Sequence, residues 1–196
     1  MRVIVTITDK AEPIINPADR RALEMALRLK DTHDAEVIAI SLGPAGAEDG
    51  LREALALGAD AAYLLSGAPL EEADAPAAAR ALARAIQMIG GYDLVLVGQA
   101  AADTGAGEIG GRLAELLDLP QISQAVEAEI EGETLRAVRL WNGAPIRVAA
   151  PLPALAAVSI QAPPARYPHG ARILNAYRSS EVTVWGAGDL GLSEDE

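Results

Sequence analysis

The residues best suited to hold a ligand lie between Gly98 and Gly110, where small residues follow a short apolar run. Residues 93–97 have the pattern of a strand that is buried on both faces, and leucines at helical spacing follow Gly110. Small residues let a ligand approach the backbone closely. The free N–H groups and the dipole at a helix N-terminus attract an anion such as phosphate. The segment therefore predicts a nucleotide site at a strand–loop–helix junction.

Gly105, Gly107 and Gly110 form a G-x-G-x-x-G pattern, which dinucleotide-binding folds also use. That fingerprint needs its first glycine directly after the strand and an acidic residue at the end of the next parallel strand. Here six residues separate Gly98 from Gly105, and a polar meander strand follows the helix. Two interpretations stay open: a mononucleotide site, which we favour, or glycines that serve only loop geometry and packing. Asp103 could orient a ribose or form an Asx turn. We expect Glu108 to face solvent, because its charge would repel a phosphate.

Other reactive side chains are not grouped for chemistry. The chain has no cysteine, and His33 and His169 have no acidic residues at metal-ligand spacing. No serine lies in the sequence context of a nucleophile elbow. We therefore predict neither a metal site nor catalytic residues.

Composition and charge restrict the class of protein. The 196 residues are 51% hydrophobic, which is enough for one α/β domain with a sizeable core. The formal net charge of −12 excludes the basic surface that nucleic-acid binding needs. The sequence shows neither an apolar run long enough to span a bilayer nor a signal-peptide pattern. We expect a cytoplasmic protein that does not insert into membranes.

Strands and helices alternate in the first 120 residues, which predicts a mostly parallel, Rossmann-like sheet covered by helices on both faces. Asn16 as N-cap and Pro17 as first helical residue mark the start of the first helix. The expected strands are 2–8, 35–42, 61–65 and 93–97, and further helices are expected at 48–57, 76–89 and after Gly107.

The pattern changes after Pro120. Three strands of an antiparallel meander are expected, with a type I′ turn at Asn142-Gly143. An apolar strand follows, and then an irregular stretch rich in proline. We divide the chain into an α/β nucleotide-binding domain at 1–160, with its meander from about 121, and a partner-contacting arm with an acidic tail at 161–196. The individual segments are strands at 123–131, 134–141, 144–149 and 152–160, an irregular stretch at 161–180 and a short strand at 181–185.

Four stretches of the chain resemble the β subunit of electron transfer flavoproteins, and they occur in that family's order. The first, INPADRRALEMALRLK, resembles the family's Asn-Pro helix, and the third, DLVLVGQAAADTGAGEIGGRLAELLDLP, resembles its nucleotide loop. The other two are EVIAISLGPAGAEDGLREALALGADAAYLL and PLPALAAVSIQAPPARYPHGARILNA. The resemblance covers most of the chain and implies a sheet of the adenine nucleotide α-hydrolase-like type.

The resemblance implies that this chain holds AMP structurally and pairs with an α subunit that carries most of the FAD site. The pair would shuttle electrons from flavin dehydrogenases, and this chain would supply no catalytic residue. The nucleotide would be lined, mostly by backbone, at Thr6, Asn16, Leu42, Gly98, Ala101, Asp103, Thr104, Gly107, Glu108 and Ile109. The arm would dock the dehydrogenase through Tyr167, His169, Gly170, Ile173 and Leu174.

Three departures from the family pattern modify these expectations. Residues 9–15 join the first strand to the Asn-Pro helix without the family's long hairpin, and the chain stops at Glu196 without its C-terminal extension. The sequence therefore resembles a short form, which favours AMP over a second FAD. Gly170 stands where the family's docking leucine would be, which predicts a dedicated dehydrogenase unless Leu174 or Ile173 replaces that leucine.

A different class of function stays open. A stand-alone adenine-nucleotide-binding domain of the stress-sensor kind shares the α/β core and the nucleotide loop. Such a domain would need neither the meander, nor the proline-rich arm, nor an α subunit. A flavoprotein α subunit gene beside this one would discriminate between the two hypotheses.

Overall fold

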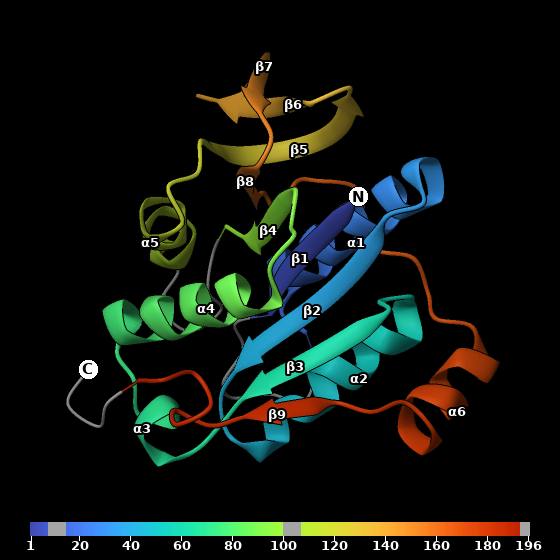
Figure 1. Cartoon of the computed structure of the whole chain (residues 1–196). Helices are drawn as coiled ribbons and strands as arrows, with labels where there is room; N and C mark the ends of the chain where they lie inside the picture. Colours follow the sequence, from blue (N-terminus) through green and yellow to red (C-terminus); the bar gives the residue numbers. More distant parts are fainter. Residues whose placement is uncertain (8–14, 100–106, 193–196) are drawn as a thin grey trace.

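A computed structural model describes residues 1–7, 15–99 and 107–192. Within these residues, nine strands form one sheet (Figure 1). The strand order is β7-β6-β5-β8-β4-β1-β2-β3-β9. The strands are β1 (Arg2–Ile7), β2 (Glu36–Leu42), β3 (Ala61–Leu65), β4 (Leu94–Gly98), β5 (Gln121–Glu131), β6 (Thr134–Trp141), β7 (Ala144–Pro151), β8 (Ala154–Val158) and β9 (Thr183–Trp185). The helices are α1 (Pro17–His33), α2 (Glu48–Leu57), α3 (Ala68–Glu71), α4 (Ala75–Ile89), α5 (Glu108–Leu116) and α6 (Gly170–Arg178), with a short 3-10 turn at Ala45–Ala47.

The sheet is mostly parallel, as predicted. Every pairing from β5 through β8, β4, β1, β2 and β3 to β9 is parallel. Only β5–β6 and β6–β7 are antiparallel, and they form the expected meander at one edge. The turn between β6 and β7 places Asn142 and Gly143 at φ 50° and 79°, the left-handed pair that a type I′ turn requires.

Helices cover both faces of the sheet, because the side chains of each buried strand alternate between two cores. Val3, Val5 and Ile7 of β1 pack with α1 and α2 on one face. Ile4 of the same strand packs with α4 and α5 on the other face. The result is the three-layer arrangement visible in Figure 1, with the carboxyl ends of the parallel strands at one edge.

Two segments differ from the expectations. No helix or strand was expected between 61–65 and 76–89, but this stretch contains the short helix α3, which begins after Gly67 with Pro69 in its first turn. The irregular stretch predicted at 161–180 contains α6, so that prediction was wrong. The prolines stop before this helix, and the His169 side chain accepts a hydrogen bond from the Ala171 N–H as its N-cap.

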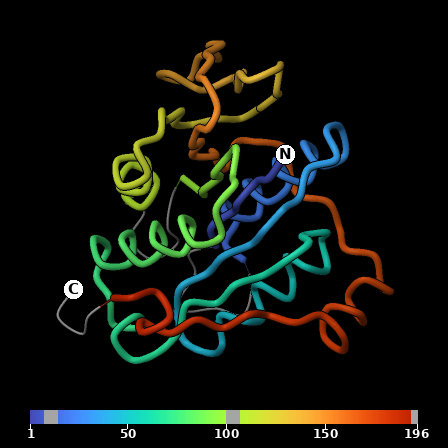
Figure 2. Tube along the Cα trace, in the orientation of Figure 1, coloured from blue at the N-terminus to red at the C-terminus, as the bar shows by residue number. Residues whose placement is uncertain are grey.

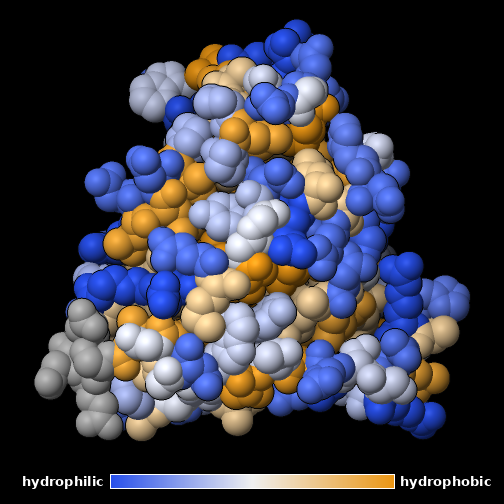
Figure 3. Space-filling model, in the orientation of Figure 1, coloured by the Kyte–Doolittle hydropathy of each residue, from blue (hydrophilic) through white to orange (hydrophobic). Residues whose placement is uncertain are grey.

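The segment after β8 runs back along the body of the protein. Figure 2 traces it from β8 to α6, which packs on α2, and then along β3 as β9. Hydrophilic residues cover most of the face shown in Figure 3, and apolar residues gather over α5, where Leu116 is partly exposed. In the part of the chain that is described, no helix is both long and apolar enough to cross a membrane.

Candidate functional site

The candidate site lies at the carboxyl ends of β1 and β4, where the chain changes direction across the sheet. From β1 the chain proceeds to β2 and β3 on one side, and it then returns to β4 on the other side of β1. Such a topological switch point leaves a crevice between the two loops, and open α/β sheets bind their ligands there. Thr6 near the end of β1 and Gly98 at the end of β4 flank this point. The strand order, which the sequence did not predict, is thus separate evidence for a ligand site at this edge.

Two buried polar side-chain atoms at this edge have no hydrogen-bond partner among the residues that the structure describes. One is the hydroxyl of Thr6, a residue with no exposed surface, and the other is Oε1 of Gln99, directly after β4. A buried polar group without a partner costs about 1–3 kcal/mol. Natural proteins keep such groups where a ligand or another function uses them. Thr6 was among the residues that the resemblance implied, whereas Gln99 was not.

The start of α1 is fastened to the end of β4 by a buried carboxylate. Asn16 caps the helix, and its Oδ1 accepts hydrogen bonds of 2.9 Å from the N–H groups of Ala18 and Asp19. Asp19 accepts from the Asn16 amide at 2.5 Å and from the Gly98 N–H at 2.9 Å, and it has no exposed surface. In the sequence, Asp19 is simply an acidic residue in the first turn of a helix, where the helix dipole favours a negative charge. The structure shows that it joins two sides of the switch point.

The start of α5 differs from that of α1, because its N-cap residue is a glycine. This residue, Gly107, lies at φ 54° and has no side chain that could cap the first turn. Uncapped N–H groups with the helix dipole attract an anion. Glu108 does not oppose this, because its carboxylate is exposed and pairs with Arg112 at 3.2 Å. The expectation that Glu108 faces solvent is confirmed, and Ile109 follows it, half-buried, in the same turn.

Three glycines near the site have structural reasons of their own. A Cβ at Gly98 would lie 2.2 Å from Asp19 Oδ1, and a Cβ at Gly107 would lie 2.1 Å from the Gln99 carbonyl oxygen. At Gly110 it would lie 2.9 Å from Val97. The interpretation that these glycines serve loop geometry and packing is therefore supported, alongside any role in binding. Because Gly107→Val would disturb the fold whether or not a nucleotide is bound, this substitution cannot be used to test nucleotide binding.

The remaining residues expected in the nucleotide site fall into two groups. One lies at this sheet edge, and the other lies outside the described residues. Leu42 ends β2, is buried, and lies on the α4 face of the strand next to β1. It therefore belongs to the same edge as Thr6. Ala101, Asp103, Thr104 and Gly105 lie outside the described residues.

The expected docking residues lie at the start of α6 and just before it. Tyr167 is 92% exposed, and Leu174 is 55% exposed one helical turn after Gly170. Ile173 is also exposed, and His169 is the N-cap. A Cβ at Gly170 would meet no atom within 4 Å, so a larger side chain fits there.

A charged cluster holds the segment before α6 against α1. Arg166 donates to Glu24 from its backbone N–H at 3.0 Å and from Nε at 2.9 Å, and its Nη2 lies 2.7 Å from Asp31. Burial raises the pKa of Glu24, but hydrogen bonds from Arg166 and Arg28 more than offset this, and the net shift is downward. The hydrogen bond from Arg166 likewise lowers the pKa of Asp31. The sequence contained no signal for this cluster, because its members are far apart in the chain.

We expect Arg166→Leu to lower the free energy of unfolding by about 2 kcal/mol, because it leaves the buried Glu24 with only Arg28 as partner. Since the pKa of Glu24 is lower in the folded state, its contribution is present above its unfolded pKa and is lost as the pH falls through its folded pKa. The difference between wild type and variant should therefore shrink below about pH 4. Urea unfolding at pH 7 and in acid measures this, with Arg178→Leu on the exposed end of α6 as control. An equal difference at both pH values would contradict it.

The described residues contain no group of histidine and acidic side chains that could hold a metal ion. His33 and His169 are both exposed and lie at opposite ends of different helices. A ligand site at the sheet edge and a partner surface along the arm stay predictions.

Comparisons with known proteins agree with this architecture. Residues 3–189 match the family model described as electron transfer flavoprotein domain. The electron transfer flavoprotein subunit beta of Thermoanaerobacterium thermosaccharolyticum is 41% identical over 192 residues, which cover 97% of this chain and 73% of that protein. The corresponding subunit of Bacillus subtilis is 35% identical over 96% of this chain and 73% of its own length. Subunit CarD of the caffeyl-CoA reductase-Etf complex of Acetobacterium woodii is 34% identical, over 96% and 72%.

Proposed function

The chain belongs to the electron transfer flavoprotein family, among relatives named as beta subunits, and on this basis we propose that it is the nucleotide-binding β subunit of such a flavoprotein. The family's members are electron-transfer proteins. In this role the chain would position a cofactor-bearing partner rather than perform chemistry with its own side chains. The observation that carries the proposal is the switch point, where the buried Thr6 hydroxyl has no hydrogen-bond partner among the described residues and the N-cap residue of α5 is a glycine.

We propose AMP as the ligand of this site. The phosphate would lie at the N–H groups of Glu108 and Ile109, where the dipole of α5 offsets the negative charge of the chain. The Thr6 hydroxyl would gain its missing hydrogen bond from the nucleotide. Asn16 would contribute through its backbone, because its side chain already caps α1. The proposed lining is completed by Leu42, Gly98 and Gly107, together with Ala101, Asp103 and Thr104, which lie outside the described residues.

The proposed partner is an α subunit that carries the FAD. The name of the relative from Acetobacterium woodii places that protein in a complex with a reductase, which supports an assembled role for this chain as well. When bound, the FAD would supply the redox chemistry. The residues of this chain would supply nucleotide binding and surfaces for the α subunit and for a flavin dehydrogenase.

Co-expression with the α-type flavoprotein subunit of the same genome tests this proposal. Nucleotides released by denaturing the purified complex would be counted by chromatography. We expect about one FAD and one AMP per complex, and no FAD in this chain when it is purified alone. A chain that binds FAD alone, or that forms no complex with the α subunit, would contradict the proposal.

We further propose that residues 166–174 dock a dedicated dehydrogenase. Gly170 provides no side chain for an apolar pocket, and Leu174 lies exposed on the same side of α6 one turn later. Burying a leucine contributes about 1.5–3 kcal/mol, or one to two decades in affinity.

We expect Leu174→Ala to weaken docking of the native dehydrogenase about tenfold, because it removes an exposed apolar contact without disturbing a buried one. Gly170→Leu should instead speed electron transfer from a general acyl-CoA dehydrogenase, since the position has room for a leucine. Stopped-flow reduction of the reconstituted complex measures both rates. Ile146→Ala, at an exposed apolar position on β7, is the control. Unchanged rates in both arm variants would refute docking by this segment.

A further inference from the structure

Helix α6, which contains the second half of the proposed docking segment (residues 166–174), lies on α2 with little apolar contact (Figure 1). Of its nine residues, all of them described, Ala176 alone is buried. Its larger apolar side chains, Ile173, Leu174 and Tyr177, are 39%, 55% and 52% exposed. A helix of this length is marginal without packing, so polar contacts must contribute to holding it in place.

An arginine of α2 supplies such a contact at the end of α6. Nη1 of Arg52 donates to the carbonyl oxygens of Ala176 and Ser180 at 2.6 and 3.2 Å. The Ala176 carbonyl is among the last four of the helix, which have no partner within it, and the helix dipole favours a cation there. The Arg52 guanidinium also lies 5.9 Å from the centre of the Tyr177 ring, and Glu48, one turn earlier in α2, pairs with it.

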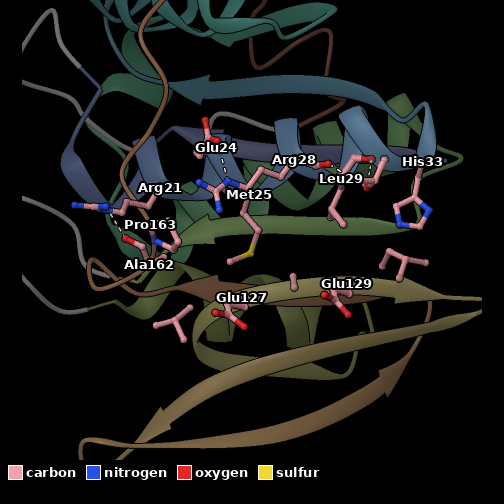
Figure 4. A pocket seen from close by; sticks show the side chains of 14 residues that line it. Arg21, Glu24, Met25, Arg28, Leu29, His33, Glu127, Glu129, Ala162 and Pro163 are labelled. Atoms are coloured by element: carbon pink, nitrogen blue, oxygen red, sulfur yellow. Dashed lines mark hydrogen bonds and ion pairs between the residues drawn. The ribbon is translucent and has the colours of Figure 1, made fainter.

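Other contacts secure the start of α6. Arg172 reaches back to α2, where its Nη1 lies 3.4 Å from the carbonyl oxygen of Leu57, the last residue of that helix. The chain before α6 is fastened to α1 by Arg21, which donates to the Ala162 carbonyl (Figure 4), and by the charged cluster around Arg166 described above. The start and the end of α6 are therefore held by different residues, and Arg52 acts at the end.

The orientation of α6 on α2 decides where the docking side chain points. Leu174 precedes Ala176 by two residues, so it lies about 200° around the helix from it at 3.6 residues per turn. When Arg52 keeps Ala176 against α2, Leu174 faces away from the body of the protein, in agreement with its exposure. A last turn that rotates or unwinds would displace the apolar side chain that a partner is to bind.

We propose that Arg52 is a positioning residue for docking of the dehydrogenase. This inference rests on the docking by residues 166–174 proposed above, and it adds a residue outside that segment. In this role Arg52 does not contact the dehydrogenase itself but keeps α6 in the orientation that presents Leu174. A partner that binds only this orientation binds more weakly in proportion as the orientation becomes less populated.

The test uses the complex of the full chain with the α-type subunit of the same genome. The electron donor is the flavin dehydrogenase of that genome that reduces the wild-type complex fastest. Arg52→Met keeps the length of the side chain but removes its charge and its donors. We expect the KM for the complex to rise about fivefold, as it would if the orientation were populated about a fifth of the time, and the limiting rate to change less than about 1.5-fold. Arg52→Lys, which retains a charged donor, should bring the KM back to within about twofold of wild type.

Arg84→Met is the matched control. Arg84 is also a helical arginine that donates to a carbonyl of the C-terminal part of the chain, that of Leu190 at 3.0 Å, but it lies on α4. We expect this variant to leave the KM within about 1.5-fold of wild type, since it leaves the contacts of α6 intact. Amide hydrogen exchange in residues 174–180 should become faster in Arg52→Met and stay unchanged in Arg84→Met.

A second comparison separates positioning from a general loss of stability. In a chain that already carries Leu174→Ala, a displaced α6 has less contact to lose, so Arg52→Met should raise the KM less than about twofold there. A defect elsewhere in the fold would raise the KM by the same factor in both backgrounds.

The outcomes distinguish this inference from the proposed function. If Leu174→Ala weakens docking while Arg52→Met leaves the KM and the exchange unchanged, the role of Arg52 is overturned and the docking proposal stands. Equal effects of Arg52→Met in both backgrounds, or an equal effect of Arg84→Met, would overturn that role as well. If Leu174→Ala leaves the KM unchanged, the docking proposal fails and this inference fails with it.

Discussion

Replacing Asp19 by alanine is expected to lower the free energy of unfolding by about 3 kcal/mol, because two buried donors lose their acceptor. These donors are the Gly98 N–H and the Asn16 amide, and both lie where α1 meets the end of β4. The loss would also loosen the crevice at the switch point. Asp19→Ala should therefore reduce nucleotide binding as well as stability.

Glu108→Ala is the matched control, since Glu108 is also acidic and also lies in the first turn of its helix. Its carboxylate is exposed and, among the described residues, pairs with Arg112, so the expected change is within about 0.5 kcal/mol. Urea unfolding followed by circular dichroism compares the two variants. Equal stabilities for Asp19→Ala and Glu108→Ala would contradict the role given to the buried carboxylate.

Replacing Thr6 by valine is expected to have opposite effects on the free and the nucleotide-bound chain. Valine has the same shape without the unpaired hydroxyl, so the free chain should become more stable by about 1 kcal/mol. The affinity for AMP should fall about tenfold, because the nucleotide loses a hydrogen bond worth about 1.4 kcal/mol. Thermal unfolding with and without AMP measures both effects.

Ser41→Ala is the control for this prediction. The Ser41 hydroxyl is also buried, on the strand beside β1, but it donates to the Ile7 carbonyl at 2.7 Å. Its loss should reduce stability and leave the affinity for AMP nearly unchanged. A Thr6→Val variant that loses stability in the same way, with unchanged AMP affinity, would show that the hydroxyl serves the fold alone.

The sequence predicted most of the elements because their signals are local. Asn16 and Pro17 begin α1 as expected, and the predicted bounds 48–57, 61–65 and 134–141 agree with α2, β3 and β6. The prediction failed at α6, where several prolines and Gly170 suggested irregular chain. Proline and glycine break a helix in its interior, but here they lie before its first turn or at its first residue.

The candidate site could be predicted only in part, because its decisive features depend on contacts between distant segments. The glycine-rich loop and the start of α5 were visible as a local pattern. The strand order that makes a switch point of β1 and β4 is not local, and neither is the bond between Asp19 and Gly98. The unpaired state of the Thr6 hydroxyl likewise follows from what surrounds it.

The nucleotide content of the wild-type chain tests the central claim most directly. The chain would be purified without added nucleotide, denatured, and its released small molecules identified by chromatography and mass spectrometry, with a parallel thermal scan in added AMP. We predict about one AMP per chain, or a thermal midpoint that rises with AMP concentration when the site has been emptied during purification. The absence of any adenine nucleotide, together with a thermal midpoint that does not respond to AMP, would contradict it.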